Sequence, residues 1–472
     1  MLNKIISFSL LAGIILGFSG CEEYLDINDD PNNPTEAPIT GLMANVSLQT
    51  GNNVQSVGAI TSFYVQYLAS PNEASSTDVQ EPVSYNGTWE SLYSNMTDIT
   101  VMIEQARESG ATDYEGVGNI LLAINLGLVT QLWGDVPYRE AFTGEILNPA
   151  YDDDQDIYAE IQDLLDAGIS LLGQESSVEL GEDDFVYEGD TDRWIKAAYA
   201  LKARYAIHLT KTSEFDPNPI LNDFLPNAFS SVADDASVSY FTEDRNPWAD
   251  VAIANAGLVL GGWVSEQLIQ AMDGTTFGVV DPRLPQMMGT TDEGEYVGTT
   301  NGAGRGDAAE QGERSTLVTG TYYSSELSPL DIITYSELKF IEAEAALRDG
   351  DDATAYEAYL DGIDAHMRQI GIADSALEAY ITDPAVAVGA NNITLDLIFK
   401  EKYVALFLNP ETWVDARRND YGYTNMTVPA NLNPELNGQF IRRLAYPDSE
   451  ITRNTEQVPA GVDLLDRIWW DN

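Results

Sequence analysis

The sequence predicts a mainly α-helical fold: a tetratricopeptide-like helical scaffold with a loop-rich variable insertion. Apolar residues recur three and four positions apart in several segments, which is the spacing of amphipathic helices. One pair of such segments is separated by a short turn at Gly350, as in helical repeats, although no clean repeat period is visible. The stretch from about 213 to 330 is rich in Pro, Gly, Asn and Thr, which predicts the insertion.

Composition excludes several classes of protein. The 472 residues include 76 Asp and Glu against 23 Lys and Arg, so the formal net charge is −53. This charge repels phosphate backbones, and nucleic acid is therefore not an expected partner. Hydrophobic residues make up 44% of the chain, which is enough for a large core and argues against extensive disorder. We expect residues 41–472 to form a single domain.

The amino terminus has the pattern of a lipoprotein signal peptide. Lys4 precedes the apolar run 5–18, which is too short to span a bilayer and is typical of a secretory signal. Residues 16–20 are LGFSG and stand directly before Cys21, the sole cysteine, as in a bacterial lipobox. We predict that residues 1–20 are removed, that Cys21 is lipidated, and that the chain meets the membrane only through this anchor. The alternative is an ordinary signal peptide with an incidental cysteine.

Residues 21–40 are predicted to form an acidic tether rich in Pro and Asn, because this composition favours turns and extended chain. Asp26, Asn28 and Asp30 could hold calcium or belong to a solvated linker, and the composition favours the linker. A second acidic run, residues 152–156, precedes a periodic segment. Acidic residues stabilise the positive end of a helix dipole, so a helix start is favoured there over a calcium site.

The helices follow in order along the rest of the chain. They are predicted at about 40–70 with interruptions, then at 92–106, 117–133, 157–171, 191–212, 335–348, 353–370, 394–408 and 412–417. Residues 71–88 are predicted to form a polar loop, and loops dominate from residue 420 onward. In the pair around Gly350, Tyr356, Tyr359 and Ile363 are expected to fill the groove between neighbouring helices.

Few residues are available for catalysis. One cysteine and two histidines exclude Cys/His zinc clusters and Cys–His nucleophiles. His208 and His366 both lie in helical stretches, where a structural role is expected. The sequence has no Gly-x-Ser-x-Gly elbow, dinucleotide fingerprint or P-loop. We therefore predict a binding protein that is not an enzyme and that needs no cofactor or metal.

A glycoside hydrolase remains a remote alternative, because such an enzyme needs two carboxylates across a cleft. Among 76 acidic residues many pairs arise by chance. The adjacent acids Glu342 and Glu344, and likewise Asp351 and Asp352, are expected to be solvated. No motif favours hydrolysis.

Seven segments in a fixed order together resemble the SusD/RagB family of SusD-like lipoproteins. They are CEEYLD (21–26), QLWGDVPY (131–138), RWIKA (193–197), DPRLP (281–285), YSELKFIEAEA (335–345), EKYVALF (401–407) and RRLAYPDSE (442–450). Each segment alone is common, but their order over nearly the whole chain is specific.

The resemblance implies a helical, tetratricopeptide-like fold and a cell-surface lipoprotein of the outer membrane of Bacteroidetes. It implies a partner, a SusC-like TonB-dependent transporter, on which the protein acts as a lid. Members capture oligosaccharides, or peptides in some branches, and pass them to the transporter without catalysis. The acidic pair Glu22-Glu23 resembles the surface-export signal of such lipoproteins. A purely structural lid and a peptide-binding member remain alternatives.

The resemblance matches scaffold positions, so ligand contacts are predicted from physics alone. Sugar rings stack on aromatic faces, and polar side chains fix their hydroxyls. Residues in predicted loops are therefore the candidates: Tyr85, Asn86, Trp89, Trp248, Tyr322 and Tyr323. Three tryptophans in helical stretches, Trp133, Trp194 and Trp413, are expected in the core. The pair Trp469-Trp470 is expected to anchor the carboxyl terminus, with a partner-facing role as the alternative.

Overall fold

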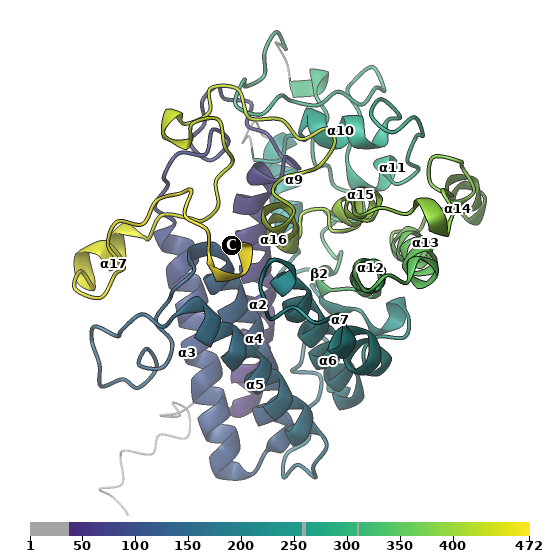
Figure 1. Ribbon diagram of the computed structural model, residues 1–472. Helices are drawn as coiled ribbons and strands as arrows, with labels where there is room; N and C mark the ends of the chain where they lie inside the picture. The colour runs from purple at the N-terminus through teal and green to yellow at the C-terminus, as the bar shows by residue number, and fades with distance from the viewer. Residues whose placement is uncertain (1–36, 257–260, 309–310) are drawn as a thin grey trace, which may run out of the picture.

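The computed structural model describes residues 37–256, 261–308 and 311–472 (Figure 1). The predicted signal peptide, Cys21 and the calcium alternative in the leader lie outside the described residues. The predicted tether ends too late, because helix α2 begins at Ile39 and its first two residues fall within the range assigned to the tether.

Four long helices pack side by side at the amino-terminal end (Figure 1). They are α2 (Ile39–Tyr64), α3 (Asn86–Ser109), α4 (Thr112–Trp133) and α5 (Asp154–Leu172). Helix α2 runs without the predicted interruptions. Helix α4 is long and apolar enough to cross a membrane, but its apolar window is 100% buried in the protein. A Cβ on its Gly116 would lie 2.8 Å from Leu172, so glycine permits the close contact with α5.

The predicted helix pair around Gly350 is present. It consists of α12 (Tyr335–Asp349) and α13 (Asp352–Gln369). Gly350 has a φ of +88° and ends α12 in the left-handed conformation that favours glycine. A Cβ on Gly362 would lie 2.9 Å from the Phe340 ring, so this glycine lets the two helices approach. The tetratricopeptide-like pairing is confirmed.

The remaining elements are shorter. Helices are α6 (Thr191–Ile207), α7 (Pro217–Pro219), α8 (Leu225–Asn227), α9 (Pro247–Ala256), α10 (Glu266–Met272), α11 (Leu284–Met287), α14 (Asp374–Ile381), α15 (Leu395–Ala405), α16 (Glu411–Arg418) and α17 (Asp448–Arg453). Strands β1 (Ala236–Val238) and β2 (Leu330–Ile333) form an antiparallel pair. The region 213–330 is irregular, as predicted. Helices α14 and α17 were not predicted.

The tryptophans expected in the core are there. Trp133, Trp194 and Trp413 are buried, and so is Trp470, while Trp469 packs partly buried against the same core. The end of the chain therefore returns to the centre of the molecule, which the label C in Figure 1 marks.

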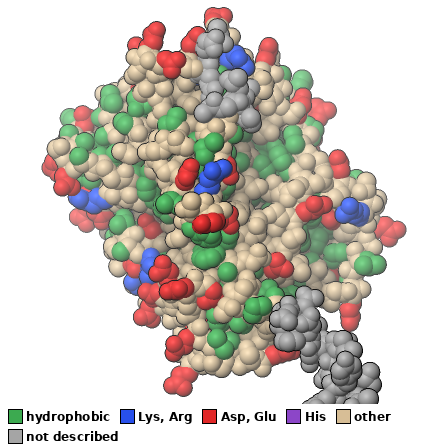
Figure 2. Space-filling model, turned by 180° about the vertical axis from the view of Figure 1, so that it is seen from behind, with side chains coloured by type: hydrophobic (Ala, Val, Ile, Leu, Met, Phe, Trp, Pro, Cys, Tyr) green, Lys and Arg blue, Asp and Glu red, His purple; other side chains and the backbone are tan. Residues whose placement is uncertain are grey.

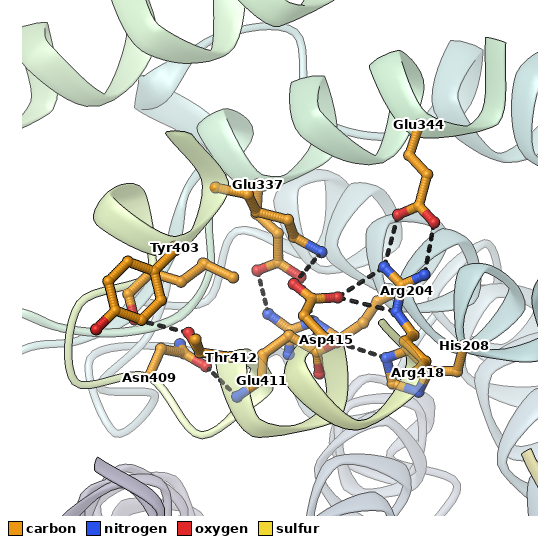
Figure 3. A network of polar contacts seen from close by, with 12 residues as sticks. Arg204, His208, Glu337, Glu344, Tyr403, Asn409, Glu411, Thr412, Asp415 and Arg418 are labelled. Atoms are coloured by element: carbon orange, nitrogen blue, oxygen red, sulfur yellow. Dashed lines mark hydrogen bonds and ion pairs between the residues drawn. The ribbon is translucent and has the colours of Figure 1, made fainter. Parts of the chain in front are cut away.

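A buried ionic network joins helices that are distant in sequence (Figure 3). Arg418 on α16 donates two hydrogen bonds of 2.6 Å to the carboxylate of Glu344 on α12, and it also binds Asp415. Arg204 on α6 binds Glu337 in the same way. The expectation that Glu344 is solvated was wrong. Glu337 and Glu344 are seven residues apart, so they share the face of α12 that points inward.

Both histidines are buried and hydrogen-bonded within the fold. His208 contacts the Tyr158 hydroxyl at 3.0 Å and Glu411 at 2.6 Å. His366 contacts Arg283 at 3.2 Å and the Tyr323 hydroxyl at 2.7 Å. Burial and a nearby guanidinium lower the pKa of each imidazole well below its usual range. The two imidazoles are neutral contacts of the core, in agreement with the structural role predicted.

The acidic run at 152–156 serves the start of α5. Asp153 accepts a hydrogen bond from the Gln155 backbone N–H and caps the helix. Asp152 accepts backbone hydrogen bonds from Tyr138 and Arg139, and Asp154 accepts one from Trp469. Within the described ranges no cluster of three or more His, Cys, Asp or Glu side chains could hold a metal ion.

Acidic groups dominate the surface. On the face shown in Figure 2, acidic side chains are spread widely, whereas Lys and Arg are few.

Candidate ligand-binding clefts

The first candidate site is a cleft of about 360 Å³ between α3, the segment 137–149 and α17, which we call the Trp89 cleft. It is lined by Trp89, Glu90, Tyr93, Ser94, Thr97, Pro137, Ala141, Phe142, Leu147, Pro149, Ser449, Glu450, Arg453 and Asn454. The segment 137–149 and α17 lie on the same side of α3 in Figure 1.

Three aromatic rings form the floor of the Trp89 cleft. Trp89 is 4% exposed and packs edge-on against Trp133, with ring centroids 5.0 Å apart. Tyr93 lies 4.7 Å from Trp89, and Phe142 continues the row, its ring within 26° of parallel to Tyr93. Tyr93 and Phe142 are only partly buried, and both line the cleft. The Tyr93 hydroxyl donates a 2.8 Å hydrogen bond to the Pro137 carbonyl, which fixes the ring.

The rim of the Trp89 cleft carries polar groups that the fold leaves free. Glu90 and Arg453 are exposed, and neither side chain has a hydrogen-bond or ion-pair partner among the residues described. Glu450 accepts a 3.0 Å hydrogen bond from the Tyr151 hydroxyl. Leu147 stands at the edge with 92% of its surface exposed. An apolar floor with a polar rim is the usual construction of a small-ligand site.

Two predicted contacts, Tyr85 and Asn86, are engaged in holding the chain together beside this cleft. The Tyr85 hydroxyl lies 3.0 Å from both the Tyr64 hydroxyl and Thr77 Oγ1. Asn86 Oδ1 accepts a 2.9 Å hydrogen bond from the backbone N–H of Ser449. Asn86 thus ties the start of α3 to the start of α17, which makes it a support of the Trp89 cleft.

Trp248 and Tyr323 line a different and much smaller space, with a volume of about 30 Å³. Trp248 lies on α9, a short helix within the irregular region 213–330, and only 4% of its surface is exposed. Tyr323 binds His366 and sets its ring edge-on to Phe407 at 5.1 Å. A space of this size holds about one water molecule and no sugar ring.

The second candidate site is a polar cleft of about 500 Å³, which we call the Tyr322 cleft. It lies where β1, the start of α6, the end of α13 and the loop before β2 meet. Its lining is Val186, Tyr187, Glu188, Arg193, Val232, Asp235, Ser237, Ser239, Tyr322, Pro329, Arg368 and Gln369. Of the sequence-predicted candidates it contains Tyr322 alone.

Strand pairing builds the wall of the Tyr322 cleft. Ser237 on β1 lies opposite Asp331 on β2, and its hydroxyl donates a 2.6 Å hydrogen bond to Asp331 Oδ1. Gln369, at the end of α13, donates a 3.0 Å hydrogen bond to Asp331 Oδ2. The register shifts between Ala236 and Ser237, and Asp235 just before the strand accepts a 2.6 Å bond from the Tyr335 backbone N–H.

Asp235, which lines this cleft, and Asp331, which lines the small space beside Trp248, both have raised pKa values. Burial, followed by the charge of Asp331, raises the pKa of Asp235 to about 8. Burial raises the pKa of Asp331 to about 6. At neutral pH the Asp235 carboxyl group is therefore mostly protonated while Asp331 is mostly ionised. The acid pairs singled out from the sequence were adjacent residues, whereas this pair is 96 positions apart.

Sequence reasoning missed most of the residues that line the clefts. The sequence could have identified Tyr93 as a candidate, because it lies four positions after Trp89 and therefore shares its helix face. No sequence pattern could have identified Phe142, since its segment has no helical or strand periodicity. Asp235 and Gln369 could not have been identified from the sequence either, because only the pairing of β1 with β2 and the position of α13 bring them together.

Comparison with known proteins places this arrangement in a family. Residues 31–447 match the family of SusD-like proteins described as "starch-binding associating with outer membrane". No curated protein matches the chain.

Three solved structures illustrate the likeness in fold. A SusD/RagB family protein from Bacteroides thetaiotaomicron VPI-5482 is 24% identical, with a TM-score of 0.75 over 92% of this chain and 99% of that one. A chitin-binding protein is 21% identical, with a TM-score of 0.78 over 92% and 100%. A chitin-binding SusD homolog from Flavobacterium johnsoniae is 20% identical, with a TM-score of 0.72 over 91% and 98%. With its mainly helical fold and a match over most of its length, the chain belongs to the SusD-like family.

Proposed function

We propose that this protein is a lipid-anchored component of the outer membrane that captures an oligosaccharide at the cell surface and delivers it to a SusC-like TonB-dependent transporter. The observation that carries the proposal is the family match over residues 31–447, whose description names starch binding and the outer membrane. Lipidation at Cys21 would supply the anchor. Two structurally similar proteins are described as chitin-binding, which favours a glycan over a peptide as the ligand.

The Trp89 cleft is the proposed capture site. Tyr93 and Phe142 present partly exposed rings. Their centroids are 6.2 Å apart, and their planes are within 26° of parallel. The C–H faces of sugar rings pack on such aromatic faces, and the row offers room for more than one ring. The hydrogen bond from Tyr93 to Pro137 holds one ring in place before the ligand arrives, which lowers the entropic cost of binding.

Polar groups on the rim would select hydroxyl-rich ligands. Glu90 can accept and Arg453 can donate hydrogen bonds without losing a partner within the fold. Asn454 binds the Pro149 carbonyl and keeps α17 against the segment 137–149. An open cleft of this kind binds and releases its ligand quickly, as a protein that passes its ligand onward requires.

Calorimetry with the chain from residue 22 onward tests the proposal. Starch-derived and chitin-derived oligosaccharides are titrated in parallel with a peptide panel. We expect a glycan to bind, and we expect Tyr93→Ala and Phe142→Ala each to weaken that binding about tenfold, as removal of a stacking contact of 1–2 kcal/mol does. Tyr356→Ala is the matched control, because this ring stacks on Tyr359 on the distant helix α13.

The outcomes separate the alternatives. Full affinity in both variants would remove the Trp89 cleft from the proposal. Failure to bind any glycan, combined with co-purification of the transporter from membranes, would favour the structural lid. Release of shortened oligosaccharides would instead favour a glycoside hydrolase.

A further inference from the structure

Two buried oxygen atoms on α17 have no hydrogen-bond partner among the described residues. They are Oγ of Ser449 and Oδ1 of Asn454, and both residues line the Trp89 cleft. The Ser449 backbone N–H donates to Asn86 Oδ1, so only its hydroxyl is left over. Asn454 Nδ2 donates to the Pro149 carbonyl, which fixes the amide and leaves its oxygen without a donor. A buried polar atom without a partner costs free energy, so two of them at one cleft require an explanation.

Other buried atoms without a partner do not gather in this way within the described ranges. Arg193 Nε is the one such atom that belongs to a residue of the Tyr322 cleft. Asn419 Nδ2 belongs to a residue beside a space of about 10 Å³, which is too small for a ligand. Ser62 and Trp263 line neither cleft. The Trp89 cleft therefore combines two unpartnered oxygens with a volume of about 360 Å³.

The same cleft supplies a free donor and apolar surface. Arg453 lies one helical turn after Ser449, is exposed, and has no hydrogen-bond or ion-pair partner among the described residues. Ala141, Leu147 and Pro149 also line the cleft, and 92% of the Leu147 surface is exposed. A ligand in this cleft thus meets a hydroxyl, an amide oxygen and a guanidinium together with apolar side chains.

These groups match the acetamido substituent of an N-acetylated sugar. An amide oxygen such as Asn454 Oδ1 accepts hydrogen bonds and cannot donate one, so its partner must carry an N–H or O–H group. The acetamido group offers an N–H for this oxygen, a carbonyl for a donor such as the Ser449 hydroxyl, and a methyl group for an apolar side chain such as Leu147. A sugar hydroxyl in its place offers one polar atom and no methyl group.

We propose that the Trp89 cleft selects N-acetylated sugars through Ser449 and Asn454 of α17. The acetamido N–H donates to Asn454 Oδ1, and the acetamido carbonyl accepts from the Ser449 hydroxyl. Both oxygens are buried without the ligand, but the Ser449 hydroxyl turns about one bond without breaking a hydrogen bond. Leu147 is almost fully exposed and moves aside at little cost, which admits the group between α17 and the segment 137–149. The inference rests on the proposed function, because it takes the ligand of this cleft to be a saccharide.

The test compares two probes that differ only at carbon 2 of each sugar ring: the β-1,4-linked tetramer of N-acetylglucosamine and that of glucose. Both probes are uncharged, so the net charge of the protein does not favour either. We expect the chain from residue 22 onward to bind the N-acetylglucosamine tetramer at least about tenfold more tightly in calorimetry. The reason is that the hydroxyl of the glucose tetramer replaces two separate polar groups and lacks the methyl contact.

Two variants locate the preference on the cleft. Ser449→Ala removes a hydroxyl that has no partner in the fold, so folding should be unaffected and the preference should fall about threefold. Leu147→Ala removes an exposed apolar contact to the methyl group and should lower the preference by a similar factor. Thr452→Ala is the matched control, because its exposed hydroxyl on α17 donates to the Asp448 carbonyl and does not line the cleft. It should leave the preference within about twofold.

Two results would overturn the inference. Equal affinities of the unmodified chain for the two tetramers would show that the substituent at carbon 2 is not recognised, and this measurement does not depend on the folding of any variant. An undiminished preference in both Ser449→Ala and Leu147→Ala would place its recognition outside this part of the cleft. Tyr93→Ala separates either result from failure of the proposed function: if glycans bind in this cleft, it weakens both tetramers alike. If no glycan binds at all, both proposals fail.

Discussion

Two buried carboxyl groups, Glu344 in the scaffold and Asp235 in the Tyr322 cleft, have opposite properties. Glu344 is fully buried, and burial alone would favour its protonated form, but the guanidinium of Arg418 lowers its pKa to about 2. Asp235 is nearly as buried, has no cation in contact, and its pKa is raised to about 8. For these two groups, the balance between burial and the charge of a partner sets the direction of the pKa shift.

The difference separates structure from function. In the scaffold, the ion pair of Glu344 with Arg418 places a cation against the buried carboxylate and joins α12 to α16. In the cleft, Asp235 accepts a backbone hydrogen bond and has no ion-pair partner among the described residues. The following experiments test this distinction, from the largest expected effect to the smallest.

The largest effect is expected from Arg418→Ala. This change leaves Glu344 and Asp415 buried without their shared guanidinium, and it should lower the free energy of unfolding by about 3–5 kcal/mol. Urea denaturation at pH 7 measures the loss. Arg348→Ala is the control, because Arg348 contacts the same Glu344 from a partly exposed position and should cost only about 0.5 kcal/mol. Equal losses in the two variants would contradict a special role for the buried pair.

A smaller effect, of opposite sign, is expected from the pH dependence of stability. The pKa of Asp235 is about 8 in the folded chain and close to its ordinary 3.8 when unfolded. The folded state thus binds more protons, and this group lowers stability as the pH rises through the range from about 4 to 8.

Asp235→Asn removes this pH dependence of the unfolding free energy, so the variant should gain stability relative to the parent as the pH increases. Denaturation midpoints at pH 5, 6.5 and 8 follow the gain. The Glu344 contribution behaves in the opposite way, since it is present above pH 4.5 and is lost as the pH falls toward 2. A parallel pair of pH profiles for the parent and Asp235→Asn would exclude a raised pKa at Asp235.

The smallest effect is expected from Arg453→Ala in the Trp89 cleft. Its side chain is exposed and has no partner among the described residues, so unfolding free energy should stay within about 0.5 kcal/mol of the parent. Glycan affinity should fall about threefold, because one hydrogen bond to the ligand is lost. Calorimetry and denaturation on the same sample separate the two quantities. A large loss of stability would show that Arg453 belongs to the fold.

Periodicity in the sequence was a good guide to the helices and a poor one to the clefts. The pair around Gly350 and the burial of Trp133, Trp194 and Trp413 were predicted from local spacing and confirmed. Trp248 lies in the irregular region as predicted, but local spacing did not show that it stands near the start of a short helix and is buried. Glu344 was misplaced because its partner is 74 positions away.

The sequence by itself determined the helical class, the order of the main helices, the irregular region 213–330 and the family, because each depends on local spacing or on motifs read along the chain. Only the tertiary structure decided which side chains share a cleft. Phe142 reaches Tyr93, and Asp235 comes close enough to Asp331 to shift its pKa, through packing between segments that are distant in sequence. Stacking energies fall off within a few ångströms and electrostatic interactions weaken with distance, so the chemistry of both clefts depends on tertiary contacts that no local pattern encodes.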